Sequence, residues 1–411
     1  MALQTFALLA NALKTDYDSV IRGQVFSETV ALSKLKSNVG IQPMANNSFT
    51  IGVRSGGHSG VYTDDGAAGA DLGTGQPVYA QPTVPARFSW GTHQIADSVL
   101  SGARGSAEAL VNIAEDFASE VALSMRKDLN RQFYQRGGTE ANNNVVATVN
   151  GASTGTTVTV DDSLSATTNV LGPSLGTDFF YEGSLIDIGT DTEHGAGTDD
   201  QITVSTVDTA TTITISASTT IADNDHIKFR NGDNTGLNGF RSFADTDNTF
   251  QGIARSTNLW AQAPLDETAE ALSESDMIRV LLRTNKRGKV NAILTGLLLY
   301  EKYASLLTSQ KRTKDPKDSL LGGFTGLEFA SGGPGVVVLL DHHCPYGDVN
   351  FVSLDSKYIT IAELDMGWMD RGEGVLKPTS LRGSYWATYR FFGNYAVRGF
   401  AAHGALQAKT T

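Results

Sequence analysis

The sequence predicts an α+β fold that carries an inserted all-β domain. Three observations predict it. A long helical pattern runs over 102–136, short alternating segments fill the acidic stretch 139–235, and mixed helix and strand patterns follow that stretch. The patterns before and after the acidic stretch complement one another, so we interpret the stretch as an insertion.

The long helix is predicted from its apolar spacing. Apolar residues recur every three or four positions, as on one face of a helix. These residues are Ala103, Ala107, Leu110, Ala114, Phe117, Val121, Met125, Leu129 and Phe133. No proline interrupts the pattern, and Gly137-Gly138 ends it. A helix over 102–136 would be about 50 Å long, so its apolar stripe needs a partner surface that one chain is not expected to cover.

Length and composition exclude several classes of protein. The 411 residues have room for two or three domains. The single Cys344 excludes an intrachain disulfide framework. No run approaches about 18 apolar residues, so neither a transmembrane helix nor a membrane partner is predicted. The N-terminus MALQTFALLANALK has no basic residue before its apolar run, which makes it a poor signal peptide.

The negative charge is confined to one segment. The net charge is −12, and the segment 140–233 holds 14 Asp and Glu against two Lys and Arg. The rest of the chain therefore has 30 acidic and 30 basic residues. An acidic surface is repelled by nucleic acid phosphates. The segment is thus expected to form a solvated outer surface and not a DNA-binding surface.

The first ninety residues predict elements that do not form a compact domain. Residues 1–49 resemble an arm. Residues 50–92 predict an extended two-stranded ribbon whose prolines mark it as an edge element. Such a ribbon is marginally stable alone, so we expect a neighbouring chain to cover it; a lid over an active site is the alternative. The residues expected to contact a neighbour are Phe49, Ile51, Val53, Phe88 and Trp90.

The rest of the chain predicts a small β domain and then an α/β region. Six short alternating segments with turn residues between them predict a barrel or sandwich over 139–235. After it, Leu265-Asp266-Glu267-Thr268 signals a helix start, and VNAILTGLLLYEKYASLL predicts a strand that runs into a helix. GLEFA, GVVVLLD, DVNFVSLD and YITIAEL predict further strands, as does the aromatic-rich C-terminus.

This order of parts resembles the major capsid protein of tailed bacteriophages, whose Hong Kong 97-type fold is shared by encapsulin shells. The most similar pieces are 248–256 with Trp260, the run 293–300, and His343-Cys344-Pro345-Tyr346-Gly347. The resemblance covers nearly the whole chain. None of these pieces is a catalytic signature, so the specificity comes from their order.

The resemblance implies a name for each part. The implied parts are an N-terminal arm (1–49), an E-loop (50–92), a P-domain (93–138, 236–274 and 376–411) with its spine helix at 102–136, an inserted acidic β domain (139–235) and an A-domain (275–375). No lysine lies between Lys36 and Lys127, so the isopeptide cross-links of some family members are not expected.

The resemblance also implies a role and partners. The chain would be a structural protein of the virion, not an enzyme, assembled in the host cytoplasm. Many copies would form pentamers and hexamers of an icosahedral shell around double-stranded DNA, which the inner face contacts non-specifically. A separate scaffolding protein, a portal and a decoration protein would be further partners. The alternatives are a secreted β-rich adhesin that uses 140–235, an encapsulin-like compartment shell, or an enzyme of the same fold class.

Few side chains predict chemistry. Asp341-His342-His343-Cys344 holds zinc ligand types, but adjacent strand residues point to opposite faces, and a strand-end loop is favoured. The acidic run Asp191–Asp200 lacks the pattern of a calcium loop. The basic run 311–317 predicts a solvated loop or a surface facing DNA. No catalytic, cofactor-binding or metal-binding residue is predicted.

Overall fold

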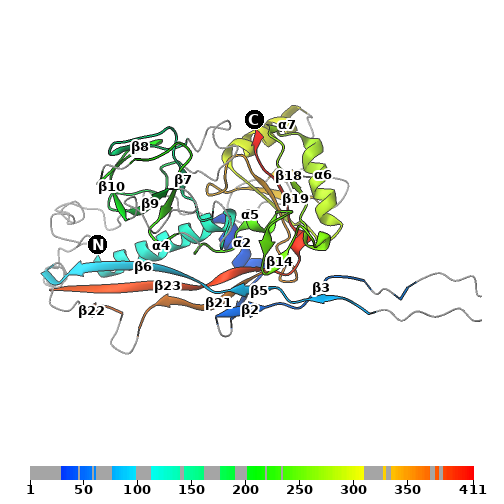
Figure 1. Cartoon of the computed structure of the whole chain (residues 1–411), viewed down its shortest axis with the longest axis horizontal. Helices are drawn as coiled ribbons and strands as arrows, with labels where there is room; N and C mark the ends of the chain where they lie inside the picture. The colour runs from blue at the N-terminus through cyan, green and yellow to red at the C-terminus, as the bar shows by residue number, and fades with distance from the viewer. Residues whose placement is uncertain are drawn as a thin grey trace, which may run out of the picture.

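The computed structural model combines a long sheet, a barrel, an α/β unit and a projecting ribbon (Figure 1). The structure describes residues 29–44, 47–57, 60–61, 76–98, 113–138, 143–161, 176–189, 201–217, 220–232, 235–309, 327–329, 335–370, 375–378 and 383–411. The acidic tip of the ribbon (62–75), the run Asp191–Asp200 and the basic run 311–317 lie outside these residues, so their predictions stay predictions.

The long sheet forms the base of the molecule. Its strand order is β1 (Ile41–Pro43), β21 (Ile359–Trp368), β23 (Ser384–Val397) and β22 (Lys377–Pro378), and β6 (Arg87–Ala96) pairs with the other side of β23. β1 is parallel to β21, and the other pairs are antiparallel. β6 and β23 pair along the whole length of β6, so segments about 300 residues apart in sequence lie side by side.

Helix α4 (Ile113–Tyr134) covers one face of this sheet, and α2 (Val30–Asn38) packs beside it (Figure 1). Helix and sheet approach closely at Gly91. A Cβ atom at Gly91 would lie 2.8 Å from Cγ1 of Val121, which leaves no room for a side chain. Gly91 therefore sets the distance between β6 and α4.

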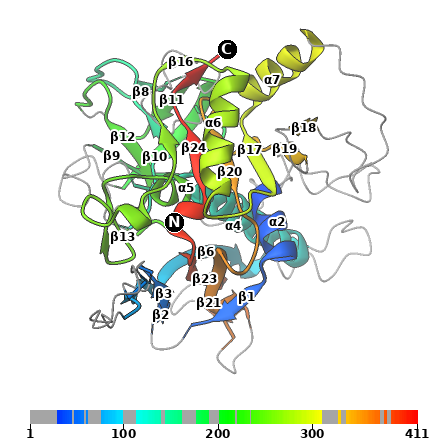
Figure 2. The same ribbon diagram turned by 90° about the vertical axis from the view of Figure 1, so that its right-hand side faces the viewer.

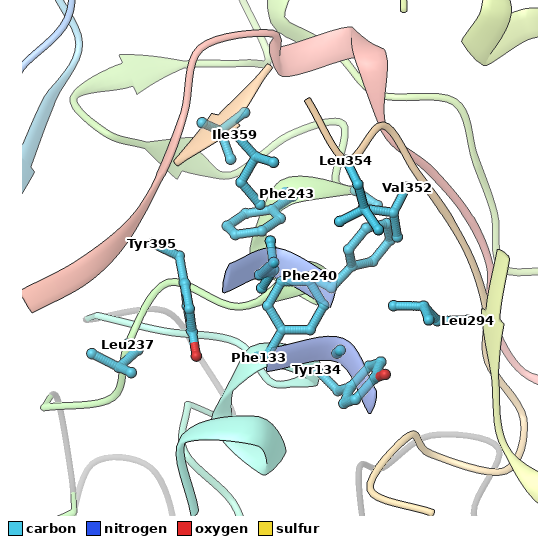
Figure 3. Close-up of a cluster of buried hydrophobic side chains, with 14 of the residues drawn as sticks. Phe133, Tyr134, Leu237, Phe240, Phe243, Leu294, Val352, Leu354, Ile359 and Tyr395 are labelled. Carbon is cyan, nitrogen blue, oxygen red and sulfur yellow. The ribbon is translucent and has the colours of Figure 1, made fainter. Parts of the chain in front are cut away.

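The core lies around the C-terminal end of α4. The ring of Phe133 packs edge-on against Tyr395 at 5.4 Å and lies 6.1 Å from both Phe240 and Phe243 of α5 (Phe240–Phe243) (Figure 3). Several polar side chains of α4 are buried as well. They are Lys127, Asn130, Arg131 and Gln132. The expectation that one chain cannot cover the apolar stripe was wrong for the C-terminal half of the helix, because Met125, Leu129 and Phe133 are buried in one core cluster with residues of α2, α5 and the long sheet.

The limits of α4 differ from the predicted 102–136. The segment 99–112 lies outside the described residues, and the helix ends two residues before Arg136. A Cβ atom at Gly137 would lie 2.0 Å from the carbonyl oxygen of Leu237, and Gly138 has φ +67°. The chain thus leaves the helix through two positions that glycine alone fits without strain.

Residues 147–229 form a barrel above α4 (Figure 1). Its strand order is β7 (Ala147–Thr148), β12 (His226–Phe229), β9 (Leu185–Gly189), β10 (Ile202–Thr209), β11 (Thr212–Ile215) and β8 (Thr157–Thr159). A bridge between Val149 and Val160, with the amide of Asp161 donating to the carbonyl of Thr148 at 2.8 Å, joins the two end strands. The barrel encloses a core of its own, rich in valine and isoleucine.

The α/β unit holds a second six-stranded sheet with helices α6 (Glu274–Asn285) and α7 (Leu297–Ser309). Its strand order is β15 (Leu265–Asp266), β24 (Gly404–Leu406), β20 (Val349–Val352), β17 (Ala292–Thr295), β19 (Val336–Leu340) and β18 (Leu327–Phe329). The C-terminus enters this sheet as β24. Past it, β25 (Lys409–Thr410) pairs with β16 (Glu270–Ala271). None of the helices among the described residues is long and apolar enough to cross a membrane.

Two predictions for this region were wrong. The strand YITIAEL was expected to belong to the A-domain (275–375). It is part of β21, which pairs with β23 in the long sheet. Periodicity identifies a strand but not its partner strand. The helix signal at Leu265-Asp266-Glu267-Thr268 instead falls on short strands. The helix begins at Glu274, where the side chain of Ser273 accepts from the amide of Asp276 at 3.3 Å.

The ribbon leaves the base of the molecule as two short antiparallel ladders (Figures 1 and 2). β2 (Ser48–Thr50) pairs with β5 (Thr83–Pro85), and further out β3 (Val53–Arg54) pairs with β4 (Tyr79–Ala80). At its root, a small hairpin of β13 (Thr249–Phe250) and β14 (Ile253–Ala254) lies nearby, and the carbonyl of Gln251 accepts from the amide of Thr83 at 3.0 Å.

Candidate functional site

An exposed group of aromatic rings lies on the face of the long sheet opposite α4. Phe88 and Trp90 of β6 are 47% and 53% exposed. Gly91, which follows Trp90, faces the helix, and successive residues of a strand point to opposite faces, so Phe88 and Trp90 both point away from the helix. The ring of Phe392 on β23 lies 4.9 Å from Phe88 and 4.7 Å from Trp90, edge-on to each. We call Phe88, Trp90 and Phe392 the aromatic patch.

A charged pair borders the aromatic patch. The guanidinium of Arg390 lies 5.4 Å from the centroid of the Phe392 ring and forms an ion pair with Asp365 of β21. Aromatic rings and arginine are enriched where protein surfaces meet, because they combine large apolar area with polar groups that tolerate partial exposure. The patch therefore has the composition of a contact surface.

The predicted contact residues on β2 and β3 lie differently. Ile51 is 6% exposed, because it packs into a cluster of its own chain with Val84 and Ala362. Its prediction as a residue that contacts a neighbour was wrong: the alternation identified one face of the strand, and the long sheet already covers that face. Phe49 and Val53 are half-buried on the same cluster.

Sequence reasoning missed other exposed apolar residues. Val78 and Tyr79, at the outer ladder of the ribbon, are 58% and 69% exposed. Tyr79 lies in a strand of two residues, which Val78 precedes, and two residues are too few for an alternating pattern. Phe392 was also missed, although the aromatic-rich C-terminus was predicted to form strands. Along β23, Tyr385, Ala387, Tyr389 and Phe391 alternate onto the face turned to α4, and Phe392 belongs to the opposite set.

The cluster at Asp341-His342-His343-Cys344 is an internal hydrogen-bond centre. The buried carboxylate of Asp341 accepts from the amide of Ala31 at 3.0 Å, the hydroxyl of Tyr134 at 2.8 Å and the side-chain nitrogen of Asn130 at 3.0 and 3.1 Å. Burial, followed by the charges of Asp348 and Asp341, raises the pKa of the Cys344 thiol well above its usual value. A neutral buried thiol is a poor metal ligand, so these residues fasten a strand-end loop to α2 and α4.

Comparison with known proteins gives a likeness of structure only. No family model matches the chain, and no curated protein does. Among solved structures, the capsid asymmetric unit of cyanophage A-1(L) matches with a TM-score of 0.55 and 12% identity, over 99% of this chain and 100% of that one. The chain has the fold of a phage capsid protein.

Further solved structures have similar coverage. The capsid of a native GTA particle matches at 14% identity over 97% of this chain and 95% of that chain, with a TM-score of 0.49. A structure from Mycobacterium phage Bobi matches at 9% identity over 98% of both chains, with a TM-score of 0.47. The family resemblance seen in the sequence is confirmed at the level of the fold.

One group of carboxylates in this capsid fold has metal-ligand geometry among the described residues. Carboxylate oxygens of Asp266, Glu270 and Asp276 lie within 4.8 Å of one another. Two basic side chains of the protein, Lys409 and Arg279, neutralise the charge of these carboxylates. Nζ of Lys409 lies 2.9 Å from Glu270 and 3.4 Å from Asp266, and Arg279 pairs with Asp266 and Asp276.

The pKa of Asp266 agrees with its role as an ion-pair partner of Lys409 and Arg279. Burial alone would raise its pKa, but hydrogen bonds from Thr268 and the charges of Lys409 and Arg279 outweigh burial and lower it to about 2. Asp266 is thus an ionised partner of two cations. The group joins β15, β16, α6 and the C-terminal strand β25.

Proposed function

We propose that this chain is the repeating structural subunit of a phage-type capsid shell. The observation that carries the proposal is the end-to-end match with a cyanophage capsid structure, which spans 99% of this chain at a TM-score of 0.55. The match includes the ribbon, the long sheet and the α/β unit together. A coverage this complete favours a shared architecture over one borrowed domain.

The exposed surfaces support self-association. The ribbon carries Val78 and Tyr79 far from the core, and the aromatic patch lies on an uncovered sheet face. A two-stranded ribbon gains stability when a further surface covers it. Apolar burial contributes about 25 cal/mol per Å², so interfaces repeated around every subunit would together stabilise a shell. We propose that sister copies cover the ribbon and the aromatic patch.

The finer features follow from the family. Pentamers and hexamers would close an icosahedral shell around double-stranded DNA, and the virion would be the place of action. The barrel would lie on the outer surface, because its segment carries the whole net charge of −12 and would be repelled by DNA inside. A separate scaffolding protein, a portal and a decoration protein are the further partners proposed.

Electron microscopy of the purified full-length protein tests this function. Rings or closed shells are the expected result, with size-exclusion chromatography showing assemblies much larger than one 43.7 kDa chain. A dispersed monomer at high concentration contradicts the proposal and favours the adhesin alternative. Nuclease-protected DNA inside particles from infected cells separates a phage shell from an encapsulin-like compartment, which would hold protein cargo instead.

A further inference from the structure

The side chain of Asn130 joins three parts of the chain. Its oxygen Oδ1 accepts from the backbone amide of Leu32 in α2 at 2.9 Å. Its nitrogen Nδ2 donates to Asp341, and the same nitrogen lies 2.7 Å from Nδ1 of His343. All of these side chains are buried. The orientation of one amide group thus links helix α2, helix α4 and the loop after β19.

The partners of this amide determine the protonation of His343. A backbone N–H can only donate, so the amide oxygen of Asn130 must face Leu32, and its NH₂ group must face both Asp341 and His343. Nδ1 of His343 therefore acts as an acceptor and carries no proton. The imidazole in this arrangement is neutral, with its hydrogen on Nε2.

The charges around His343 are mixed. Burial, followed by the positive charges of Lys127, His342 and Arg131, lowers its pKa, while the carboxylate of Asp341 opposes that shift. From the barrel, the ring of Phe179 lies 5.2 Å from the imidazole. Oδ1 of Asp341 is 3.9 Å from Nδ1, which is beyond hydrogen-bond distance. A proton added at Nδ1 therefore meets the NH₂ group of Asn130 first.

We propose that His343 and Asn130 form a proton-sensitive latch that fastens helix α2 to helix α4. When Nδ1 takes a proton from solvent, its N–H opposes the N–H groups of Asn130. Turning the amide over relieves this conflict by presenting Oδ1 to the imidazolium. The NH₂ group then faces the N–H of Leu32, so that hydrogen bond is lost, and Asp341 loses its bonds from Asn130. Acidification thus loosens α2.

One further contact makes α2 the part that responds. The amide of Ala31 depends on the same Asp341 carboxylate, so the first turn of α2 has two fastenings in one network. The amides of the first turn of a helix have no partner within the helix. Loss of the network leaves them open to exchange with water, whereas among the described residues no hydrogen bond joins the barrel core to the network.

Hydrogen exchange of the full-length protein tests the latch. We expect the protection of residues 31–35, after correction for the intrinsic pH dependence of exchange, to fall between pH 7 and pH 5. Because the pKa of His343 is lowered in the closed latch, the latch weakens by up to about tenfold for each pH unit between the ordinary histidine pKa near 6.5 and that lowered pKa. Protection of the barrel strand β9 should stay constant. An equal fall in α2 and β9, or none in α2, overturns the proposal.

Variants at histidines provide the controls. His343→Gln offers an amide oxygen to Asn130 and does not titrate, so α2 should keep its protection at pH 5. His226→Gln, in the barrel, should behave as the wild type. Loss of α2 protection in His343→Gln equal to that in the wild type overturns the latch. If His343→Gln does not fold, the wild-type comparison of α2 with β9 decides alone. The readout does not use shell assembly, so the two proposals can fail separately.

Discussion

The guanidinium of Arg131 donates from Nη1 to the carbonyl oxygen of Val145 at 3.0 Å, which joins helix α4 directly to the start of the barrel. Nη2 donates to Asn144 and to Asp128, each at 2.7 Å. The ring of Phe229 lies 5.7 Å from the guanidinium. The side chain is fully buried, so one residue of the helix positions the barrel.

Arg131→Ala should therefore destabilise the whole chain. The change leaves the Val145 carbonyl and the Asn144 amide buried without their donor. We expect a loss of about 3–5 kcal/mol in the free energy of unfolding, as when one partner of a buried ion pair is removed. Arg131→Lys keeps the charge but not the forked donors, so its free energy of unfolding should lie between those of the wild type and Arg131→Ala. A urea midpoint unchanged in Arg131→Ala would contradict this account of the junction.

Variants at Ile51, beside the ribbon ladder, and at Trp90, in the long sheet, separate folding from assembly. Ile51→Ala removes a buried side chain and should cost about 2–4 kcal/mol of stability. Trp90→Ala removes a half-exposed ring and should leave the thermal midpoint of the monomeric protein nearly unchanged, while it reduces the yield of large assemblies. Size-exclusion chromatography and thermal unfolding measure the two effects. Normal assembly of Trp90→Ala would exclude the aromatic patch as a contact surface.

Local periodicity predicted the apolar face of α4 but not its polar contacts. Met125, Leu129 and Phe133 were placed on one stripe, and the structure buries all three. Asn130 and Arg131 are also buried, yet nothing near them in sequence indicates it. Asn130 bonds to a carboxylate 211 positions away. Such a contact depends on the tertiary fold, which a spacing pattern does not report.

The same limit explains the errors at the candidate site. Alternation along β23 showed that one face is apolar, but it could not show that Phe392 on the other face meets Trp90 of a strand about 300 residues earlier. The ribbon was predicted from its edge character. Which of its side chains remain exposed depends on the long sheet beneath, and this is why Ile51 and Trp90 have opposite environments.

A buried histidine is expected to make the folded protein less stable at acidic pH. His403 packs against Phe240 and Phe243, and burial lowers its pKa to about 4. The unfolded chain has a histidine pKa near 6.5, so between about pH 6.5 and pH 4 the unfolded state binds the extra proton. Stability should therefore fall as the pH decreases through this window, by about 3 kcal/mol in total.

His403→Phe isolates this contribution. The substitution keeps an aromatic ring beside Phe240 but cannot titrate. The difference in unfolding free energy between the variant and the wild type should shift in favour of the variant as the pH falls from 7 to 4, as measured by urea denaturation. A difference that is the same at both pH values would show that His403 does not bind a proton on unfolding in this range.

The C-terminal strand β25 should be stabilised by the ion pairs that Lys409 forms with acidic side chains. Lys409 is fully buried, and its Nζ donates to Glu270 and to the carbonyl of Thr268, each at 2.9 Å. Lys409→Met leaves the carboxylates of Asp266, Glu270 and Asp276 close together with Arg279 as their remaining cation among the described residues. Because Asp266 and Glu270 are partly exposed, we expect a loss of about 1–3 kcal/mol. Lys357→Met, at an exposed lysine, is the matched control and should unfold as the wild type does.

The pH dependence of the same variant gives a second, independent readout. A carboxyl group whose pKa is about 2 in the folded chain contributes stability above its unfolded pKa near 3.9, and that stability is lost as the pH falls toward 2. Removing Lys409 takes away one of the charges that lower the pKa of Asp266. The acid limb of Lys409→Met should therefore be shallower than that of the wild type between pH 4 and pH 2. Parallel curves for the two proteins would mean that Thr268 and Arg279 alone account for the ionised state of Asp266.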